Sequence, residues 1–229
     1  MNVIRTRPAI LGALALALAA TGCGSSDDGG AGDGIVERAN QAMASTSFHG
    51  KGSTTAVAGG TQEIWSDPRQ GFRARITIGT DEPFGEILCR DKDAFMSAEL
   101  ALEPLRKTGG SGLDVPADLK SSFVRIPATG GCASFYAIPE SGRTDKKLAQ
   151  DVTGVATTAV IATGGSTTDT YFVAATNKPY ILRLDSNRAG HVSSTTYDSF
   201  GAPVSITMPT PDKIVSMDDF RARVMAVRR

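Results

Sequence analysis

The residues best placed to do chemistry in this 229-residue chain are its three cysteines. The first, Cys23, follows the small residues 20–22 at the end of an uncharged apolar run, Ala9 to Ala20, which Arg5 and Arg7 precede. The run is too short to span a bilayer as a stable helix, which takes roughly 20 residues. A basic flank, a short apolar segment and small residues before a cut are typical of a secretory signal peptide.

Thr21-Gly22-Cys23 resembles the lipobox of bacterial lipoproteins, in which the cysteine thiol receives a diacylglycerol and becomes the new N-terminus. That motif usually has Leu three residues before the cysteine, where this chain has Ala20. The alternative is an ordinary secretory cut that leaves a soluble protein. The Gly/Ser/Asp-rich stretch 24–34 has the composition of a flexible tether, and two acyl chains provide the double signal that stable anchoring requires.

These observations divide the chain into a signal peptide at 1–22, a lipidated Cys23 with its tether at 23–34, and one domain at 35–229. We expect the lipid anchor to hold this domain on the extracytoplasmic face of the cell membrane. The remaining cysteines, Cys89 and Cys132, would lie in an oxidising compartment, so a disulfide is the default interpretation and two buried free thiols the alternative. Such a bond would close a loop of about 44 residues and contribute roughly 4 kcal/mol in the chain-entropy model.

Other reactive side chains are sparse, and their spacing matches no catalytic motif. The stretch 109–113 lacks the final glycine of a nucleophile elbow, and no Ser-x-x-Lys occurs. The two histidines, His49 and His191, form no His-x-x-x-His metal pattern, and we expect both to be exposed strand or turn residues. Acidic residues of the tether are interpreted as solvated charges rather than a calcium site. The sequence thus predicts no enzyme, no metal and no cofactor.

Composition limits the classes of partner that the protein is expected to bind. Lys plus Arg and Asp plus Glu both number 24, so the net charge is zero and nothing suggests a nucleic-acid surface. Removing 22 of 229 residues leaves 207, which fits one domain. We expect a monomer whose hydrophobic content of 41% is sufficient for a core.

Period-two patterns dominate the elements. Gly71 to Gly79 is the clearest strand, because apolar side chains alternate with Arg73, Arg75 and Thr77. A helix is predicted at Ile35 to Ala44, with Asp33 as its cap. Further strands are predicted at 63–66, 84–90, 93–98, 152–162, 170–175, 180–185, 192–197 and 203–208, the later ones as a meander.

Between the two strand-rich halves, Leu100 to Glu140 is broken by four prolines and predicts a helical or loop excursion that leaves the sheet. Short helical pieces are expected within it at 99–106 and 117–122. A final helix begins at Ser216, which forms a capping-box pattern with Asp219. The predicted fold class is α+β: a strongly curved antiparallel β-sheet, an open half-barrel, with helices packed in or over its concave face.

The layout resembles the actinobacterial surface lipoproteins of the LolA/LppX-like (LppX/LprG-type) open-barrel kind. The resemblance rests on the cysteine and tether, on the stretch 44–50, and on Tyr171–Ala175, Pro179–Leu184, Tyr197 and Pro203-Val204. It implies a half-barrel that holds acyl chains and a role in carrying lipid or lipidated molecules. Candidate cavity residues are Ile76, Ile78, Phe84, Leu182 and Ile206.

Few aromatic residues are available, at 6% of the chain, so such a cavity would be lined mainly by aliphatic side chains. The excursion 100–140 or the helices would gate it. The alternative is a surface structural or protein-interaction module in which the same apolar residues form a packed core.

Overall fold

The computed structural model describes residues 34–79, 82–109, 112–176 and 178–227. The predicted signal peptide, Cys23 and Asp33 lie outside these ranges. Within them, no helix combines the length and apolar character needed to cross a membrane.

The described residues form one sheet of 13 strands with three α-helices. The strands are β1 (Phe48–Ser53), β2 (Gly60–Asp67), β3 (Gly71–Ile78), β4 (Glu82–Arg90), β5 (Asp93–Ser97), β6 (Phe123–Pro127), β7 (Arg143–Thr144), β8 (Asp151–Val152), β9 (Val155–Gly164), β10 (Thr167–Ala174), β11 (Ile181–Arg188), β12 (His191–Asp198) and β13 (Ile214–Ser216). The helices are α1 (Ile35–Ala44), α2 (Ala98–Gly109) and α3 (Met217–Val227), with short 3-10 turns η1 (Ala117–Leu119), η2 (Cys132–Phe135), η3 (Lys146–Leu148) and η4 (Pro211–Lys213).

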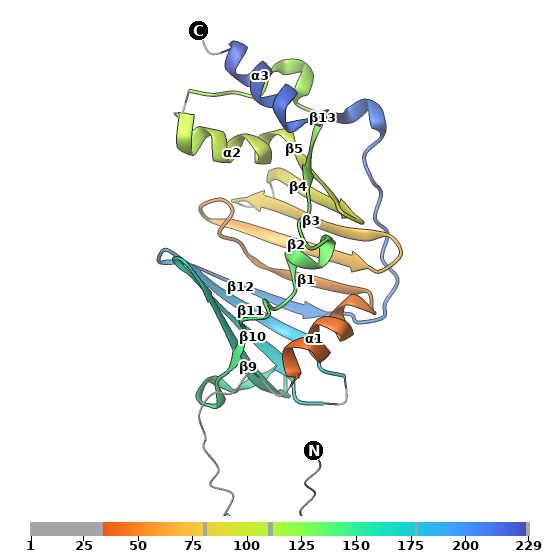
Figure 1. The fold of residues 1–229 in the computed structure, drawn as a ribbon, viewed down its shortest axis with the longest axis vertical. Helices are drawn as coiled ribbons and strands as arrows, with labels where there is room; N and C mark the ends of the chain where they lie inside the picture. The colour runs from red at the N-terminus through yellow and green to blue at the C-terminus, as the bar shows by residue number, and fades with distance from the viewer. Residues whose placement is uncertain (1–33, 80–81, 110–111, 177, 228–229) are drawn as a thin grey trace, which may run out of the picture.

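The strands are ordered β13-β6-β5-β4-β3-β2-β1-β12-β11-β10-β9-β7, and β8 pairs beside β9. Every pairing is antiparallel except β13 with β6. The two strand-rich halves meet where β1 pairs with β12, with His49 opposite Asp198. The sheet curves strongly and stays open between its edge strands, while α1 lies over its concave side (Figure 1). The predicted α+β half-barrel is confirmed.

Strand β3 shows how alternating apolar and polar side chains determine which face of the sheet is buried. Phe72, Ala74 and Ile76 are buried on the concave side, while Arg75 between them is exposed. Helix α1 has the predicted bounds, but Gly34 occupies its N-cap in a left-handed conformation, without a side-chain cap. Glycine adopts that conformation at no steric cost, so the helix begins without a polar cap.

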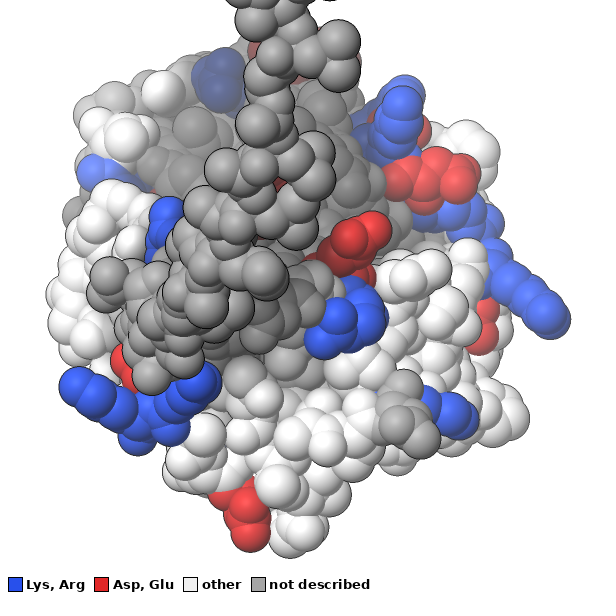
Figure 2. Space-filling view, turned by 60° about the horizontal axis from the view of Figure 1, so that its bottom comes forward, with Lys and Arg blue, Asp and Glu red and all other residues white. Residues whose placement is uncertain are grey.

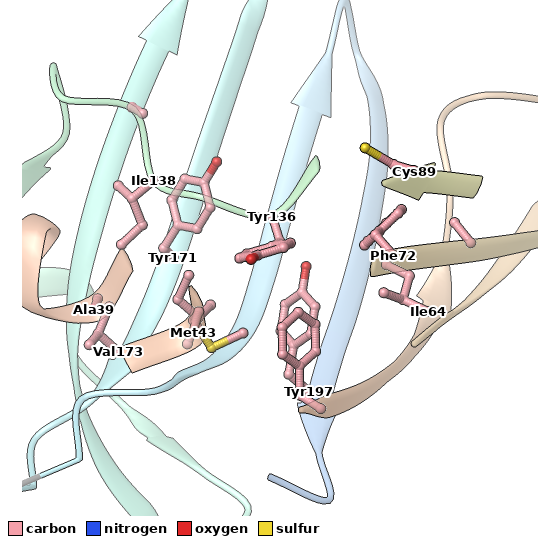
Figure 3. Packing of buried hydrophobic residues seen from close by; sticks show 14 of the residues in the cluster. Ala39, Met43, Ile64, Phe72, Cys89, Tyr136, Ile138, Tyr171, Val173 and Tyr197 are labelled. Carbon is pink, nitrogen blue, oxygen red and sulfur yellow. The ribbon is translucent and has the colours of Figure 1, made fainter. Parts of the chain in front are cut away.

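One end of the concave face is filled by an apolar core (Figure 3). Met43 of α1, Phe48 of β1 and Phe72 of β3 are almost fully buried there, and the ring of Tyr136 packs against both phenylalanines. The rings of Phe48 and Tyr136 meet edge to face with centroids 5.0 Å apart. Such aromatic contacts stabilise the core beyond the area that they bury.

Tyr136 belongs to a segment that we call the crossing segment, Ala128 to Gly142, which runs from β6 to β7 across the concave face (Figure 1). The prediction that residues 100–140 leave the sheet is wrong in part. Phe123–Pro127 forms β6, which pairs with β5, and the chain returns over the sheet rather than away from it. Of the prolines in residues 100–140, only Pro127 ends an element, since Pro104 lies inside α2 and Pro116 precedes η1.

A second cluster lies at the β13 edge, where α2, α3 and β6 bury Leu102, Val124 and Phe220. The capping box predicted for α3 is confirmed in one half: Ser216 Oγ accepts from the Asp219 N–H at 3.0 Å, while Asp219 Oδ2 accepts from Ser216 Oγ at 2.7 Å rather than from its backbone N–H.

The predicted strand at Pro203–Met208 is wrong, because these residues adopt no regular structure. Their backbone bonds instead to the side chain of Gln70, which donates to Val204 O at 2.7 Å and accepts from Ile206 N at 3.0 Å. The amide side chain of Gln70 thus makes two of the backbone hydrogen bonds that a neighbouring strand would otherwise make.

Candidate ligand-binding cavity

Beyond the apolar core, the concave face opens into a cavity of about 540 Å³. Ligand pockets of proteins have volumes of about 300–1,000 Å³, so the size suits a small amphipathic molecule. Its lining residues come from β2, β3, β4, β11, β12, the β1–β2 hairpin, α2 and the crossing segment: Thr54, Thr55, Ala56, Gln62, Ile64, Phe72, Ala74, Ile76, Ile87, Lys107, Phe135, Leu184, Ser186, Arg188, His191, Ser193, Thr195 and Tyr197.

One wall of the cavity is apolar. Alternation along β2, β3 and β4 directs Ile64, Ile76 and Ile87 to the same side of the sheet, and the register places Ile64 opposite Ala74 and Ala74 opposite Ile87. Phe135 of the crossing segment adds an aromatic ring, stacked on Phe72 with centroids 4.9 Å apart.

The other wall, on β11 and β12, is polar. Ser186, Ser193 and Thr195 face the cavity there, and Gln62 Nε2 donates to Thr195 Oγ1 at 2.8 Å across the β1 strand. Ser186 Oγ donates to Asp169 Oδ1 on β10. Because these groups satisfy one another, the wall remains polar at little energetic cost.

Three tyrosines are buried in the core, and one of them, Tyr197, also lines the cavity. The ring of Tyr197 lies against Gly50 so closely that a Cβ on that glycine would be 2.9 Å from the ring. Burial raises the pKa of Tyr197 well above its usual range, with smaller contributions from Tyr171 and Asp169. Burial also raises the pKa of Tyr171 and of Tyr136. All three therefore stay neutral at physiological pH.

The mouth of the cavity is formed by loops. The β1–β2 hairpin contributes Thr54 to Ala56, α2 contributes Lys107, and the β11–β12 hairpin contributes Arg188 and His191. An adjoining hollow of about 530 Å³ shares five of these residues and extends past Ile78, Phe84 and Val192. Val192 is 74% exposed, so the rim of the mouth is itself partly apolar.

The predicted cavity residues lie in different parts of the structure. Ile76 lines the cavity, and Ile78 and Phe84 line the adjoining hollow. Leu182 is 9% exposed in a separate packed cluster, because β11 has an extra residue where the register shifts between Phe172 and Val173. Ile206 is buried outside the cavity lining, and its backbone N–H donates to Gln70 Oε1. Whether any of them contacts lipid stays a prediction.

The disulfide predicted between Cys89 and Cys132 is present, with Cα atoms 5.5 Å apart. It joins β4 to the start of the crossing segment. The bond therefore holds the segment that supplies Phe135 against the strand that supplies Ile87.

The two histidines lie in different environments. His49 is on the convex side of β1, where its ring nitrogens lie 3.0 Å from Glu63 and 3.1 Å from Asp198. In the parts of the chain that the structure describes, no group of three or more His, Cys, Asp and Glu side chains forms a metal site. His191 is exposed, as predicted, but it lies at the cavity mouth, which the sequence did not indicate.

Sequence reasoning missed the polar wall. Ser193 and Thr195 alternate with Val192 and Ser194, and a strand whose polar side chains face bulk water has the same pattern. The local sequence therefore does not distinguish a cavity-facing strand from a solvent-facing one. Figure 2 shows one end of the molecule, where basic and acidic residues both occur and several lie next to one another among uncharged residues.

No family model matches the sequence, and no curated protein matches it. Solved structures that are similar include the lipoprotein LppX of Mycobacterium tuberculosis, at 10% identity and a TM-score of 0.46 over 76% of this chain and 96% of that one. LprF of Mycobacterium bovis has 13% identity and a TM-score of 0.40 over 77% and 95%. An uncharacterised conserved protein of Thermus thermophilus has 11% identity and a TM-score of 0.49 over 80% and 96%.

At these TM-scores the likeness assigns neither a function nor a ligand. The half-barrel fold described above rests on this chain's own strand order and register.

Proposed function

We propose that this protein is an exported, membrane-anchored lipoprotein that holds the acyl part of a lipid in the cavity of its half-barrel. The observation that carries the proposal is the cavity itself, about 540 Å³ in volume and bounded on one side by aliphatic side chains. Each buried methylene contributes about 0.8 kcal/mol, so one acyl chain would bind without specific polar contacts. Carrying a lipid requires no catalytic group.

Two aspartate substitutions test the cavity. Ile78 borders the hollow beside the mouth and is half-buried, whereas Leu182 is buried in a packed cluster. Ile78→Asp should leave the domain folded, because water reaches the new charge. It should weaken the binding of 1-monopalmitoylglycerol, because the charge lies where the acyl chain would bind. Leu182→Asp should unfold the domain, because a charge in a packed core has no access to water.

The readouts are circular dichroism for folding and native mass spectrometry for bound lipid, on protein purified from membranes and again after delipidation. A parent protein that carries no lipid and binds no added monopalmitoylglycerol would defeat the proposal. The packed-core interaction module would then be the better interpretation.

The anchor is tested separately. Cys23→Ala should move the protein from the membrane fraction to the soluble fraction and prevent lipoprotein processing. The lipobox interpretation would be wrong if the variant stayed in the membrane fraction as firmly as the parent and were processed in the same way.

A further inference from the structure

Basic groups, and no carboxylates, line the cavity mouth. Among the described residues that line the cavity, Lys107, Arg188 and His191 are basic, and none is Asp or Glu. The chain as a whole has 24 basic and 24 acidic residues, so this excess is local. In the adjoining hollow Glu103 is present, but its Oε1 is 2.9 Å from Arg106 Nη1 and is already paired.

The two permanent cations are available to a ligand. In the described ranges the side chain of neither Lys107 nor Arg188 makes a hydrogen bond or ion pair, and both residues are exposed. Arg106, one residue away on α2, shows the contrast: its guanidinium contacts Glu99, Glu103 and Asp114.

An acidic group also lies behind the mouth. The carboxylate of Asp169 on β10 raises the pKa of Tyr171, and the guanidinium of Arg188 lowers it, so both charges act on the same hydroxyl. Asp169 Oδ1 already accepts a hydrogen bond from Ser186 Oγ. Asp169 and Arg188 form no ion pair within 4.0 Å, so the guanidinium keeps its donors.

The cations approach the mouth from two elements. Lys107 lies on α2, while Arg188 and His191 flank the turn between β11 and β12. Figure 1 shows α2 and this hairpin on either side of the β1–β2 hairpin, and Lys107, Arg188 and His191 all line the same cavity. Ile76 of the apolar wall lines this cavity too.

We infer that the ligand is an anionic lipid, whose phosphate binds between Lys107 and Arg188 while its acyl chain enters the cavity. This inference rests on the proposed function. Arginine offers a planar fork that matches phosphate oxygens, and lysine offers a point charge. The hydroxyls of Ser186 and Ser193 lie along the polar wall, where the ester or glycerol part of the lipid would follow the phosphate inward.

The test uses two lipids that differ only in the phosphate, 1-palmitoyl lysophosphatidate and 1-monopalmitoylglycerol, each below its critical micelle concentration. Calorimetry on the delipidated protein should give a lower Kd for the phosphate lipid, by on the order of tenfold in low salt. The preference should fall when salt is raised, because exposed charges are screened.

The double variant Lys107→Gln/Arg188→Gln should bring the ratio of the two Kd values close to one. The matched control is Arg69→Gln/Lys120→Gln, which removes two exposed cations away from the cavity lining and should keep the parent's ratio. Glycerol 3-phosphate should compete weakly, since a free phosphate ester has no chain to bury.

Equal Kd values in the parent, or a preference that persists in the double variant, would overturn the inference while leaving lipid binding intact. Strong competition by glycerol 3-phosphate would mean a site for a soluble phosphate instead. If neither lipid binds the parent, the proposed function fails and the inference fails with it.

Discussion

Asn40 and Ile138 exchange two hydrogen bonds across 98 residues of sequence. Asn40 Nδ2 donates to Ile138 O at 2.8 Å, and Ile138 N donates to Asn40 Oδ1 at the same distance. The side-chain amide thus satisfies both backbone hydrogen-bonding groups of Ile138, as a neighbouring strand would. It ties α1 to the crossing segment, which the disulfide also attaches to β4.

Asn40→Ala should lower the free energy of unfolding by roughly 1–3 kcal/mol, because the buried Ile138 backbone loses both partners. Gln41→Ala, on the exposed side of the same helix, is the control and should change stability by less than about 0.5 kcal/mol. Urea unfolding measures both. Equal effects of the two substitutions would contradict a specific role for the amide.

Reduction of Cys89–Cys132 should destabilise the domain by about 4 kcal/mol or less, because the bond closes a loop between residues that are 43 apart. Thermal unfolding with and without reductant measures the difference. The double variant Cys89→Ala/Cys132→Ala should melt at the lower temperature in either condition. A parent whose melting does not respond to full reduction would show that the bond contributes nothing.

Gly50→Ala should destabilise the protein by about 1–3 kcal/mol, because its new methyl group would overlap the ring of Tyr197. Combining it with Tyr197→Leu should cost less than the sum of the two single changes, since the smaller side chain relieves the overlap. Gly164→Ala on β9, where a Cβ meets nothing within 4 Å, is the control and should be close to neutral. Additive effects in the cycle would rule out the Gly50–Tyr197 contact as the cause.

Alkaline pH should weaken the fold through its buried tyrosines. The pKa of Tyr197 is raised by burial, so above the ordinary value of 10.0 the unfolded chain loses this proton while the native protein keeps it. Stability is therefore fully present below pH 10 and falls as pH rises, by about 1.4 kcal/mol per pH unit for each such group.

Tyr197→Phe removes one of these contributions, so its stability should decline less steeply than that of the parent between pH 10 and about 11.5. Urea midpoints at a series of pH values provide the comparison. If the stability difference between parent and variant stayed constant over that range, Tyr197 would have no raised pKa.

Several elements could be predicted because their signal is local. Phe72 to Ile78 alternates with charged residues, and that alternation depends only on one face being dry. Helix α1 and the later meander were found for the same reason. Element boundaries shifted by a few residues, since strand pairing extends β11 and β12 through polar hairpin residues that carry no apolar pattern.

The rest depends on contacts between distant parts of the chain. Leu182 reads as a member of the apolar face of β11, but the irregularity beside Phe172 reverses its direction, and a one-residue shift exchanges the two faces of a strand. The course of the crossing segment depends on Cys132 meeting Cys89. Ser186 and Thr195 read as water-facing, because period two does not say whether the water is outside the protein or in a cavity.

The pairing of β1 with β12 determines when this protein can fold. His49 lies opposite Asp198, so the middle of the sheet requires two pieces of chain that are 149 residues apart in sequence. Closing so long a loop costs entropy before any contact repays it, and topologies of this kind fold slowly. A chain that emerges N-terminus first has β1 waiting unpaired on one side until almost everything else has appeared. Any chaperone that keeps β1 from aggregating would have to act between the synthesis of β1 and that of β12.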